Sequence, residues 1–552
     1  MSSSPISAGE SPVVIGRSRT GELYAEAGGV RIHSAYDPRR EARRFLETQM
    51  AGDVPSTWVV LGEALGHLTA AIRERFPRAR VVPICYDRRL AGPGEELEWT
   101  PASSEGIDSF FDRTLGELEI EGLKVIEWAP SAAAFPREAE RAKAALAQAV
   151  REISGSVTTT RAFGLRWARN SLANFLGLDG FVDARPSALQ AQTSRAAVVA
   201  ASGPSLSEAL PLITSVREKV LLVSLPSSLA ALAAAGLRPD LLVATDGGSW
   251  ASLHLAQIPR LPPGKPLPIA MPLSAARGAW QAGGPVLLLA QDSLFERELL
   301  ATSGLSALPI ASHGTVAAAA IALALLLTRG PVVLAGLDLC FRDILEHARP
   351  HSFDPLWEGS RLAPAYGALF RRAVDRTARK TDSAGARTST AFRAYAGWLS
   401  GLSNNDRRLF RLNPSPVALP GLTPVDQDEF RRLVGKPADS ERAAGIHLRS
   451  AAALSHAERP TALGAVLRRL EERLATGRRT LLASRPSDDT DAGDLPLPAE
   501  LGEILYELDT AGLFEAKWAA RLDGYEAARR RLLASVETVE SRIAGMRSLY
   551  LK

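Results

Sequence analysis

Cysteine is scarce in this sequence: the 552 residues include two, Cys85 and Cys340. A fold stapled by disulfides or built around structural zinc needs more thiols than this. Both cysteines stand in or beside stretches that favour buried strands. We therefore expect two buried, free thiols in a protein kept in the reducing cytoplasm.

Long apolar runs are also missing. The best run, Val316–Leu327, falls well short of the roughly 20 apolar residues that cross a bilayer. Residues 1–11 are rich in serine and lack the charged and then apolar pattern of a secretion signal. We therefore expect a cytoplasmic protein without a membrane-spanning helix.

The sequence lacks a strong charge of either sign. Its 65 basic and 61 acidic residues leave a net charge of +4, and no run of Lys and Arg is interleaved with aromatic residues. Nucleic acid is therefore not an expected partner. The chain has the length of about three domains, and at 46% hydrophobic residues it can bury a large core.

The region from residue 191 to residue 434 alternates short apolar runs with helical patterns. The expected strands, after a first one around Val198 and Val199, are Val220–Val223, Leu241–Thr245, Pro268–Met271, Val286–Leu289, Leu308–Ala311 and Val332–Ala335. This order predicts an α/β fold with a doubly wound, mostly parallel sheet and helices on both faces. Ligands of such folds bind beyond the carboxyl ends of the strands.

Small and polar residues follow several of these expected strands. Gly203-Pro204-Ser205 comes after the first strand, Thr245-Asp246 ends the third, and Gly336-Leu337-Asp338 follows the last. Because the strands are parallel, their carboxyl ends meet at one edge of the sheet. This edge is the predicted rim of a nucleotide-sized site.

The first 190 residues carry an α/β pattern of their own. The expected strands are Thr57–Leu61, Arg80–Cys85 and Leu123–Trp128, and Gly62 and Gly66 form a turn before the first helix of this pattern. The arrangement is Rossmann-like, but the spacing is G-x-x-x-G rather than G-x-G-x-x-G. The turn indicates either a dinucleotide or adenosyl site, or a docking domain whose glycines only permit the turn.

Asn170 and Asn174 lie four positions apart on an expected helix close to the central region. Asparagine is a mediocre helix former. The pair therefore either holds a hydrogen-bond network between domains or faces solvent.

A helical composition begins after about Val434. The last helix spaces its apolar residues three and four positions apart, at Leu532, Val536, Val539, Ile543, Met546 and Tyr550. This short seam fits an intramolecular helical bundle, a dimer or a docking surface. The whole pattern predicts three domains: a Rossmann-like domain at 1–190, a central domain at 191–434 and a helical domain at 435–552.

Several motifs together resemble those of the motility-associated factor (Maf) glycosyltransferase family, whose central domain is also described as similar to the 6-hydroxymethylpterin diphosphokinase MptE. The motifs are His33-Ser34, Tyr36-Asp37-Pro38, Glu41-Ala42, the Gly62/Gly66 turn, Gly203-Pro204-Ser205-Leu206, Arg238-Pro239-Asp240, Thr245-Asp246, His313-Gly314-Thr315 and Gly336-Leu337-Asp338-Leu339. They span about residues 30–430. The resemblance implies a central domain similar in fold to bacterial sialyltransferases.

The resemblance also implies an activity. The family transfers a nonulosonic, sialic-acid-like sugar from its CMP donor to Ser or Thr hydroxyls of flagellin, so a CMP-activated sugar and flagellin are the expected partners. The sequence departs from the family pattern at Leu337, where the family has Gln, and at Cys340-Phe341, where an aromatic residue usually follows Asp. These departures keep open a member that has lost catalysis and serves binding or assembly.

A CMP-activated sugar carries its own leaving group, so the protein must bind the nucleotide and its phosphate. Gly203 allows close approach of the backbone, and Ser205 begins a helix whose amides favour an anion, unless the motif is a plain helix cap. Ser312 to Thr315 is a second site of this kind. Asp246 suits ribose hydroxyls or a metal such as Mg²⁺, or is a simple turn residue. The expected donor-binding residues are Gly203, Pro204, Ser205, Ser224, Thr245, Asp246, Gly314, Thr315 and Asp338.

The reaction also needs a base for the acceptor hydroxyl. His313 and His347 are the expected candidates, because histidine titrates near neutral pH unaided. His347 and His351 flank an Arg-Pro pair in an expected loop. Expected contacts of the sugar carboxylate or the acceptor are Arg342, Arg349 and Asn413. A surface side chain without a catalytic role is the alternative for the loop residues.

A second activity fits the same region. A Mg²⁺-dependent pyrophosphokinase acting on a pterin-like alcohol needs ATP and carboxylates that hold the metal. Asp240, Asp246, Asp292 and Asp338 are available, but the sequence has no Gly-x-x-x-x-Gly-Lys-Ser/Thr motif. The large flanking regions favour a macromolecular acceptor over a small alcohol.

Overall fold

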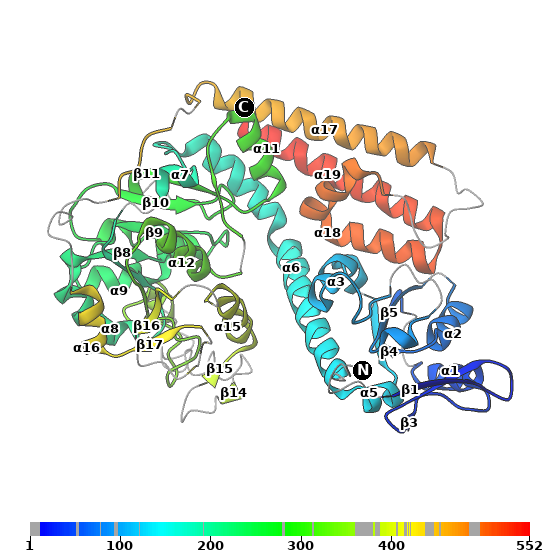
Figure 1. Ribbon diagram of the computed structural model, residues 1–552. Coiled ribbons are helices and arrows are strands. Elements are labelled where there is room, and N and C mark those ends of the chain that lie inside the picture. Colours follow the sequence, from blue (N-terminus) through cyan, green and yellow to red (C-terminus); the bar gives the residue numbers. More distant parts are fainter. Residues whose placement is uncertain are drawn as a thin grey trace, which may run out of the picture. The chain divides into compact units, whose positions relative to one another are not determined.

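The computed structural model describes residues 12–50, 55–77, 79–92, 98–120, 122–190, 193–278, 282–311, 314–358, 379–380, 387–403, 407–412, 417, 419, 421–435, 446–451, 454–484 and 497–551. The chain divides into two compact units (Figure 1). Unit 1 consists of Met1–Ala162 and Arg473–Ser541, and unit 2 of Phe163–Glu472 and Arg542–Lys552. Each unit is therefore built from two separate segments of the chain, and the division into three domains stays a prediction.

A nine-stranded sheet forms the centre of unit 2, and its neighbouring strands are parallel. The strands are β7 (Ala196–Ala200), β8 (Val220–Ser224), β9 (Leu241–Val243), β10 (Leu267–Met271), β11 (Gly283–Ala290), β12 (Leu308–Pro309), β13 (Val332–Ala335), β16 (Leu409–Leu412) and β17 (Thr423–Val425). Each central strand expected from the sequence is present, although β9 and β12 are shorter than expected. The predicted α/β fold with a large parallel sheet is confirmed.

The strand order reverses between β7 and β13. The order is β12-β11-β10-β9-β8-β7-β13-β16-β17, so the chain builds outward from β7 to β12 and then returns to the other side of β7. Such a switch point opens a crevice at the carboxyl ends of the two central strands. The turns after β7 and β13 therefore lie where doubly wound folds bind their ligands.

Helices cover both faces of this sheet. Val198 of β7 packs into a core with α8 (Leu206–Ser215) and α16 (Gln427–Val434), whereas Val199 packs into a second core with α12 (Val316–Leu327). Successive residues of a strand point to opposite faces, which explains the alternation. Further elements of this unit are α7 (Pro186–Leu189), α9 (Leu229–Ala234), α10 (Ala251–Leu255), α11 (Leu294–Ser303), α13 (Asp354–Glu358), β14 (Arg379–Lys380), β15 (Arg387–Thr388) and α15 (Thr390–Ser403).

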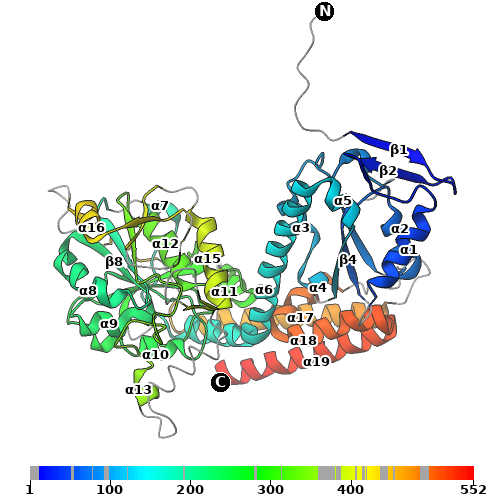
Figure 2. The same ribbon diagram turned by 90° about the horizontal axis from the view of Figure 1, so that it is seen from below.

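Unit 1 contains a smaller parallel sheet of order β5-β4-β6. The strands are β4 (Thr57–Glu63), β5 (Arg80–Cys85) and β6 (Leu123–Glu127), which confirms the three expected strands. Figure 2 shows α1 (Pro38–Thr48) and α2 (His67–Arg75) on one side of β4 and α3 (Ile107–Thr114) on the other. The short helices α4 (Glu117–Ile120) and α5 (Ala129–Ala134) complete this Rossmann-like arrangement.

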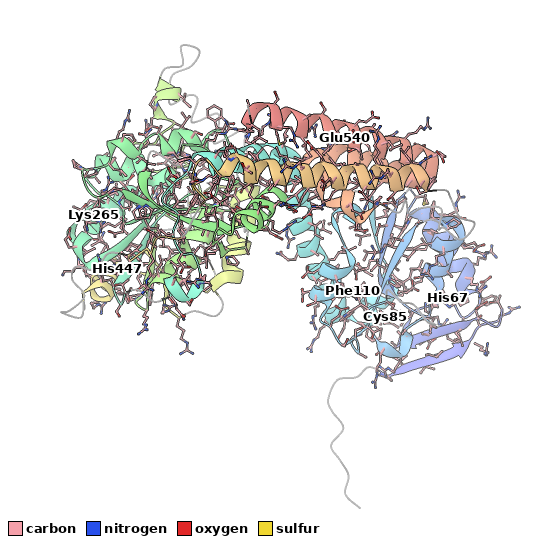
Figure 3. All side chains as sticks on the ribbon, turned by 90° about the horizontal axis from the view of Figure 1, so that it is seen from above. His67, Cys85, Phe110, Lys265, His447 and Glu540 are labelled. Carbon is pink, nitrogen blue, oxygen red and sulfur yellow. The ribbon has the colours of Figure 1, made fainter. Side chains whose placement is uncertain are left out.

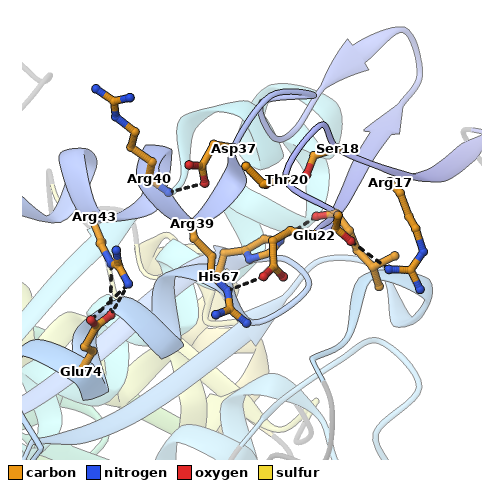
Figure 4. A network of polar contacts seen from close by, with 12 residues as sticks. Arg17, Ser18, Thr20, Glu22, Asp37, Arg39, Arg40, Arg43, His67 and Glu74 are labelled. Carbon is orange, nitrogen blue, oxygen red and sulfur yellow. Dashed lines mark hydrogen bonds and ion pairs between the residues drawn. The ribbon is translucent and has the colours of Figure 1, made fainter.

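An antiparallel sheet that the sequence analysis did not predict precedes α1. It pairs β1 (Val13–Arg17), β2 (Leu23–Ala27) and β3 (Val30–Arg31) in that order. Asp37 caps α1, since its carboxylate accepts a hydrogen bond from the backbone N of Arg40 at 3.0 Å (Figure 4). An exposed ion pair between Arg43 and Glu74, at 2.9 Å, links α1 to α2 in the same view.

Long helices make up most of the remaining chain. They are α6 (Pro136–Gly177), α17 (Arg459–Ala483), α18 (Ala499–Leu522) and α19 (Tyr525–Tyr550). The apolar seam expected in α19 is buried within the chain at Leu532, Val536, Val539, Ile543 and Met546. The hydroxyl of Tyr550, the last residue of the seam, donates to the carbonyl of Arg169 at 3.1 Å. Across the described ranges, no helix is long and apolar enough to cross a membrane.

Both cysteines are buried and free, as expected. Burial raises the pKa of the Cys340 thiol to about 11, and it raises the pKa of Cys85 further. Figure 3 shows Cys85 at the end of β5, inside unit 1. A thiol with a raised pKa is a poor nucleophile at neutral pH, so neither cysteine is a candidate for catalysis.

Glu296 of α11 is a buried carboxylate that accepts hydrogen bonds from the residues after two strands. Its side-chain oxygens accept hydrogen bonds from the backbone N of Leu273, after β10, and of Gln291, after β11, both at 2.8 Å. Burial raises the pKa of Glu296 to about 7, although these backbone bonds act in the opposite direction. Glu63 in unit 1 is a second buried carboxyl whose pKa burial raises to about 7.

Replacing Glu296 should change how stability depends on pH. Because its folded pKa lies above the usual 4.5, the folded protein keeps a proton that the unfolded chain releases between pH 4.5 and about 7. The unfolding free energy therefore falls across this window, by up to about 3 kcal/mol from this group, and then levels off. In Glu296→Gln, urea denaturation at about pH 5 and about pH 7.5 should show a smaller pH effect. The exposed Glu218→Gln is the control, and an unchanged pH effect in Glu296→Gln would contradict the assignment.

Candidate functional site

Two turns meet at the switch point of the nine-stranded sheet. The backbone N of Gly203, after β7, donates to the carbonyl of Gly336, after β13, at 2.7 Å. The Asp338 side chain is buried and accepts hydrogen bonds from the backbone N of Ser205 at 2.6 Å and from its Oγ at 2.5 Å. The structure therefore brings together four expected donor-binding residues: Gly203, Pro204, Ser205 and Asp338.

Close contact between the turns requires glycine at two positions. Gly336 has a φ of +73°, and a Cβ there would lie 2.8 Å from the carbonyl oxygen of Ala201. A Cβ on Gly203 would lie 2.6 Å from Oδ2 of Asp338. A larger residue at either position would push the two turns apart.

The Asp338 carboxylate occupies the N-terminus of α8, where we expect the donor phosphate. Amides at a helix N-terminus stabilise a nearby anion, and here the protein itself supplies one. Burial raises the pKa of Asp338, whereas the hydrogen bonds from Ser205 and the charge of Arg411 act in the opposite direction. The Ser205 amide is thus already bonded, and a phosphate contact at this residue stays a prediction.

Arg411 of β16 is bonded to the same turn. Its buried guanidinium donates to the carbonyl of Leu337 at 2.5 Å, to that of Asp338 at 3.3 Å, and also to that of Val417. Burial lowers the pKa of Arg411 to about 10, although the charge of Asp338 opposes this shift. The sequence analysis missed Arg411, whose signal is a single arginine inside the apolar strand Leu409–Leu412.

The Leu337 departure from the family pattern affects a buried position. The Leu337 side chain belongs to the apolar core that includes α12, and its carbonyl is the group that Arg411 contacts. The turn therefore uses the backbone of residue 337, and the leucine side chain contributes to packing.

His347, an expected base, lies beside the turn after β7. Its Nδ1 is 3.3 Å from Oγ of Ser202, and the backbone N of Ala348 donates to the carbonyl of Ser202 at 2.8 Å. A backbone hydrogen bond thus links the loop that carries His347 to the switch point. The other expected base, His313, lies outside the described residues, as does Asn413.

His347 belongs to a group of rings, here called the ring cluster, that consists of His254, His347, His351 and Phe353. The His347 and His351 rings stack with centroids 4.3 Å apart, and the His351 ring meets that of His254 at 5.2 Å. Phe353 packs 4.7 Å from His254 and 4.9 Å from His351. Burial, and next the charge of His347, lower the pKa of His254 to about 4, so His254 is neutral at physiological pH. The sequence analysis missed His254, because its place on α10 has no link along the chain to the loop of His347.

The arginines expected to bind a carboxylate already contact carboxylates of the protein. Arg342 forms an ion pair with Glu208, and Nε of Arg349 lies 3.2 Å from Oδ2 of Asp354. The same Asp354 oxygen accepts a hydrogen bond from the backbone N of His351 at 2.7 Å. A sugar carboxylate would have to compete with Glu208 or Asp354 for these guanidinium groups.

Thr245 and Asp246 follow β9 at the same edge of the sheet. Asp246 is exposed, and its Oδ1 accepts a hydrogen bond from the backbone N of Gly248 at 2.7 Å. This bond is typical of an aspartate turn, and a contact of Asp246 with a ligand stays a prediction. Ser224, at the end of β8, is buried, and its hydroxyl has no hydrogen-bond partner among the described residues.

Gly314 and Thr315 precede α12. Gly314 has a φ of +66°, and the Thr315 hydroxyl accepts a hydrogen bond from the backbone N of Ala317 at 3.3 Å. Thr315 is therefore the N-cap of this helix. Its role in donor binding stays a prediction.

Asn170 and Asn174 of α6 form a buried hydrogen-bond network within unit 2. Nδ2 of Asn170 donates to the carbonyls of Gly247 and Ser274, at 3.0 and 3.1 Å. Nδ2 of Asn174 donates to the carbonyls of Leu273 and Ala275, at 2.9 and 2.8 Å. These bonds rule out the solvent-facing alternative and fix the loops that follow β9 and β10.

Protein side chains pack against the glycine turn that begins at the end of β4 in unit 1. Gly62 has a φ of +77°, and a Cβ there would lie 2.9 Å from Cβ of Ser131 and 3.0 Å from the Tyr86 ring. The buried Glu63 accepts a hydrogen bond from the backbone N of Thr69 at 3.0 Å and so caps α2. These contacts favour the interpretation in which the glycines permit the turn over the one in which they cradle a cofactor.

The described carboxylates and histidines at the carboxyl ends of the strands do not form a metal-binding cluster. Within the ranges that the structure describes, no group of three or more His, Cys, Asp or Glu residues is placed to hold a metal ion. Asp246 remains the exposed carboxylate that suits a metal bound together with a nucleotide phosphate.

Comparisons with known proteins match the chain to a family model, to a relative and to a solved structure. Residues 175–343, which include both turns of the switch point, match the family model described as 6-hydroxymethylpterin diphosphokinase MptE-like. An uncharacterized protein of Treponema pallidum (strain Nichols) is 26% identical over 325 residues, and this stretch spans 59% of the chain and 66% of that relative. The solved Maf glycosyltransferase of Magnetospirillum magneticum AMB-1 covers 98% of the chain, and 94% of its own, with a TM-score of 0.60 and 12% identity. At this identity the last match shows a shared fold.

Proposed function

We propose that this protein is a glycosyltransferase that moves a nonulosonic, sialic-acid-like sugar from its CMP donor to Ser or Thr hydroxyls of flagellin in the cytoplasm. One observation carries the proposal: Nδ1 of His347 lies within hydrogen-bond distance of Oγ of Ser202, at the switch point of the sheet. The fold match to a Maf glycosyltransferase supports the same activity. In this proposal the nucleotide binds beyond the carboxyl ends of the central strands, and His347 supplies the base.

In this proposal His347 takes the proton of the acceptor hydroxyl. Nδ1 of His347 lies 3.3 Å from Oγ of Ser202, and in the tautomer in which Nδ1 carries the hydrogen, Nε2 is the nitrogen that accepts the proton. The hydroxyl oxygen forms a bond to the anomeric carbon while the bond from that carbon to the CMP phosphate breaks, and CMP leaves with the electron pair. We assign Asp246 to the ribose hydroxyls, or to a Mg²⁺ ion that offsets the phosphate charge.

A second candidate function is a Mg²⁺-dependent pyrophosphokinase on a 6-hydroxymethylpterin-like alcohol. The match of residues 175–343 to the MptE-like family model is the observation that favours it. This activity requires ATP, so the choice of nucleotide separates it from the glycosyltransferase.

Nucleotide binding tests the two functions directly. Because a ligand that binds the folded state raises the melting temperature, we expect CMP or CTP to stabilise the purified protein. The thermal-shift panel contains CMP, CTP, ATP and ADP, each with and without Mg²⁺, and calorimetry checks every hit. A preference for ATP with Mg²⁺ would support the pyrophosphokinase instead. No response to any nucleotide would favour a member of the family that has lost catalysis.

A further inference from the structure

Trp250 is a large, exposed aromatic residue in the segment that follows the carboxyl end of β9 in unit 2. It follows β9 by a short loop that begins with Thr245 and Asp246, and its side chain is 64% exposed. Resting on the proposed function, we propose that the indole of Trp250 is the surface on which the base of the donor nucleotide stacks. The edge on which it lies is the one where doubly wound folds bind nucleotides.

The indole is supported by other rings. Phe353 meets Trp250 in an edge-to-face contact with centroids 6.0 Å apart, and Phe353 in turn packs against His254 and His351 of the ring cluster. The cluster continues through His347 to Ser202 at the switch point. Trp250 therefore stands at the outer end of a continuous row of rings whose inner end is the proposed base.

Two hydrogen bonds hold the loop between β9 and Trp250, one from α6 and one within the loop. Asn170 bonds the carbonyl of Gly247 at 3.0 Å, and Asp246 accepts from the backbone N of Gly248 at 2.7 Å. An aromatic platform that is ordered before the ligand arrives loses little entropy on binding. With the base on Trp250, we place the ribose at Asp246 and the phosphate toward Ser202, because these two residues follow the parallel strands β9 and β7 at the same edge of the sheet.

A planar base suits this surface better than a purely polar ligand. Stacking removes water from the face of the indole and from the face of the base, while the polar edges of the base stay hydrated. Base stacking on an aromatic side chain accepts any base, because every base has a π-face. Trp250 would then set affinity, and its neighbours would set the choice of nucleotide.

Calorimetric titration with two ligands tests the inference. We expect Trp250→Ala to weaken CMP binding by about ten-fold or more, while Trp250→Phe retains most of the affinity. Ribose 5-phosphate, which has the sugar and phosphate but no base, should bind wild type and Trp250→Ala equally. Tyr36→Ala is the matched control, because Tyr36 is 63% exposed but lies in unit 1, and it should bind CMP as wild type does. Melting temperatures without ligand verify that each variant is folded.

The outcomes separate this inference from the proposed function. CMP binding that Trp250→Ala leaves unchanged would overturn the stacking role and leave the glycosyltransferase in place. Binding of ATP instead of CMP, weakened by Trp250→Ala, would overturn the proposed donor and support the stacking role. Equal losses of CMP and ribose 5-phosphate affinity in Trp250→Ala would show a general disturbance of the loop and overturn the inference, and so would a wild type that binds no nucleotide.

Discussion

Replacing His347 by Asn is expected to slow sugar transfer by about 10²–10⁴-fold, the usual contribution of a general base. Asparagine can keep a hydrogen bond to Ser202 but cannot take the proton of the acceptor hydroxyl. The binding of CMP should stay close to that of wild type, because the change acts on the acceptor side of the reaction. The measurement is transfer from a CMP-activated nonulosonic sugar to purified flagellin, followed by the mass of the product.

His447→Asn is the matched control for this experiment. His447 is an exposed histidine of unit 2, labelled in Figure 3, and it is not part of the ring cluster. Its replacement should leave the transfer rate unchanged. A full transfer rate in His347→Asn would remove His347 from the role of base and leave His313 as the candidate.

Replacing Asp338 by Asn is expected to lower the unfolding free energy by about 2–4 kcal/mol. The Asp338 carboxylate accepts hydrogen bonds from both the backbone N and Oγ of Ser205, at 2.6 and 2.5 Å. The amide of asparagine presents a donor at one of these positions, so one buried group of Ser205 loses its acceptor. The buried guanidinium of Arg411 also loses a negative charge that stabilises it. Urea denaturation near neutral pH measures the loss.

Asp292→Asn is a close control for Asp338→Asn. Asp292 also follows a strand of the nine-stranded sheet, but its side chain is 81% exposed and its ion pair with Arg297 faces solvent. Exposed pairs contribute little, and asparagine tolerates the positive φ of this position. We expect a change within about 0.5 kcal/mol. Similar losses in both variants would mean that the bonds to Ser205 and the charge of Arg411 do not carry the effect.

The sequence alone predicted β7 to β13 of the nine-stranded sheet and β4 to β6 of the smaller parallel sheet, because buried strands of a parallel sheet are short apolar runs between polar turns. Arg80–Cys85 has the predicted bounds, and the strand starts at Val220, Leu241 and Leu308 also agree. Apolar runs locate these strands because nearly all of their residues are buried.

Strands and helices whose side chains are partly exposed to solvent were harder to predict. β1 carries mostly exposed side chains, among them Val14 at 59%, so its sequence shows no alternation of polar and apolar residues. The 42 residues of α6 form a single helix, whereas the sequence indicated a helix only around Asn170 and Asn174. The length of such a helix depends on packing partners far away in the chain.

The candidate site could be predicted in part for a similar reason. Residues at strand ends, such as Ser205 and Asp338, follow from the topology of a parallel sheet. His254 and Arg411 reach the site from separate elements, α10 and β16, and their contacts with the loop of His347 and the turn of Asp338 arise only when the chain folds. The side chains that surround the expected residues were therefore missed, although the expected residues themselves were named.

The interleaved composition of the two units has a consequence for synthesis on the ribosome. Unit 1 combines Met1–Ala162 with Arg473–Ser541, and unit 2 combines Phe163–Glu472 with Arg542–Lys552. The nascent chain thus carries the first segment of unit 1 for more than three hundred residues of translation before the helices that complete it emerge. Unit 2 likewise needs Arg542–Lys552, in which the Tyr550 hydroxyl donates to the carbonyl of Arg169. Neither unit is therefore complete when its first segment leaves the ribosome, and the surfaces that the later segments cover stay exposed during translation.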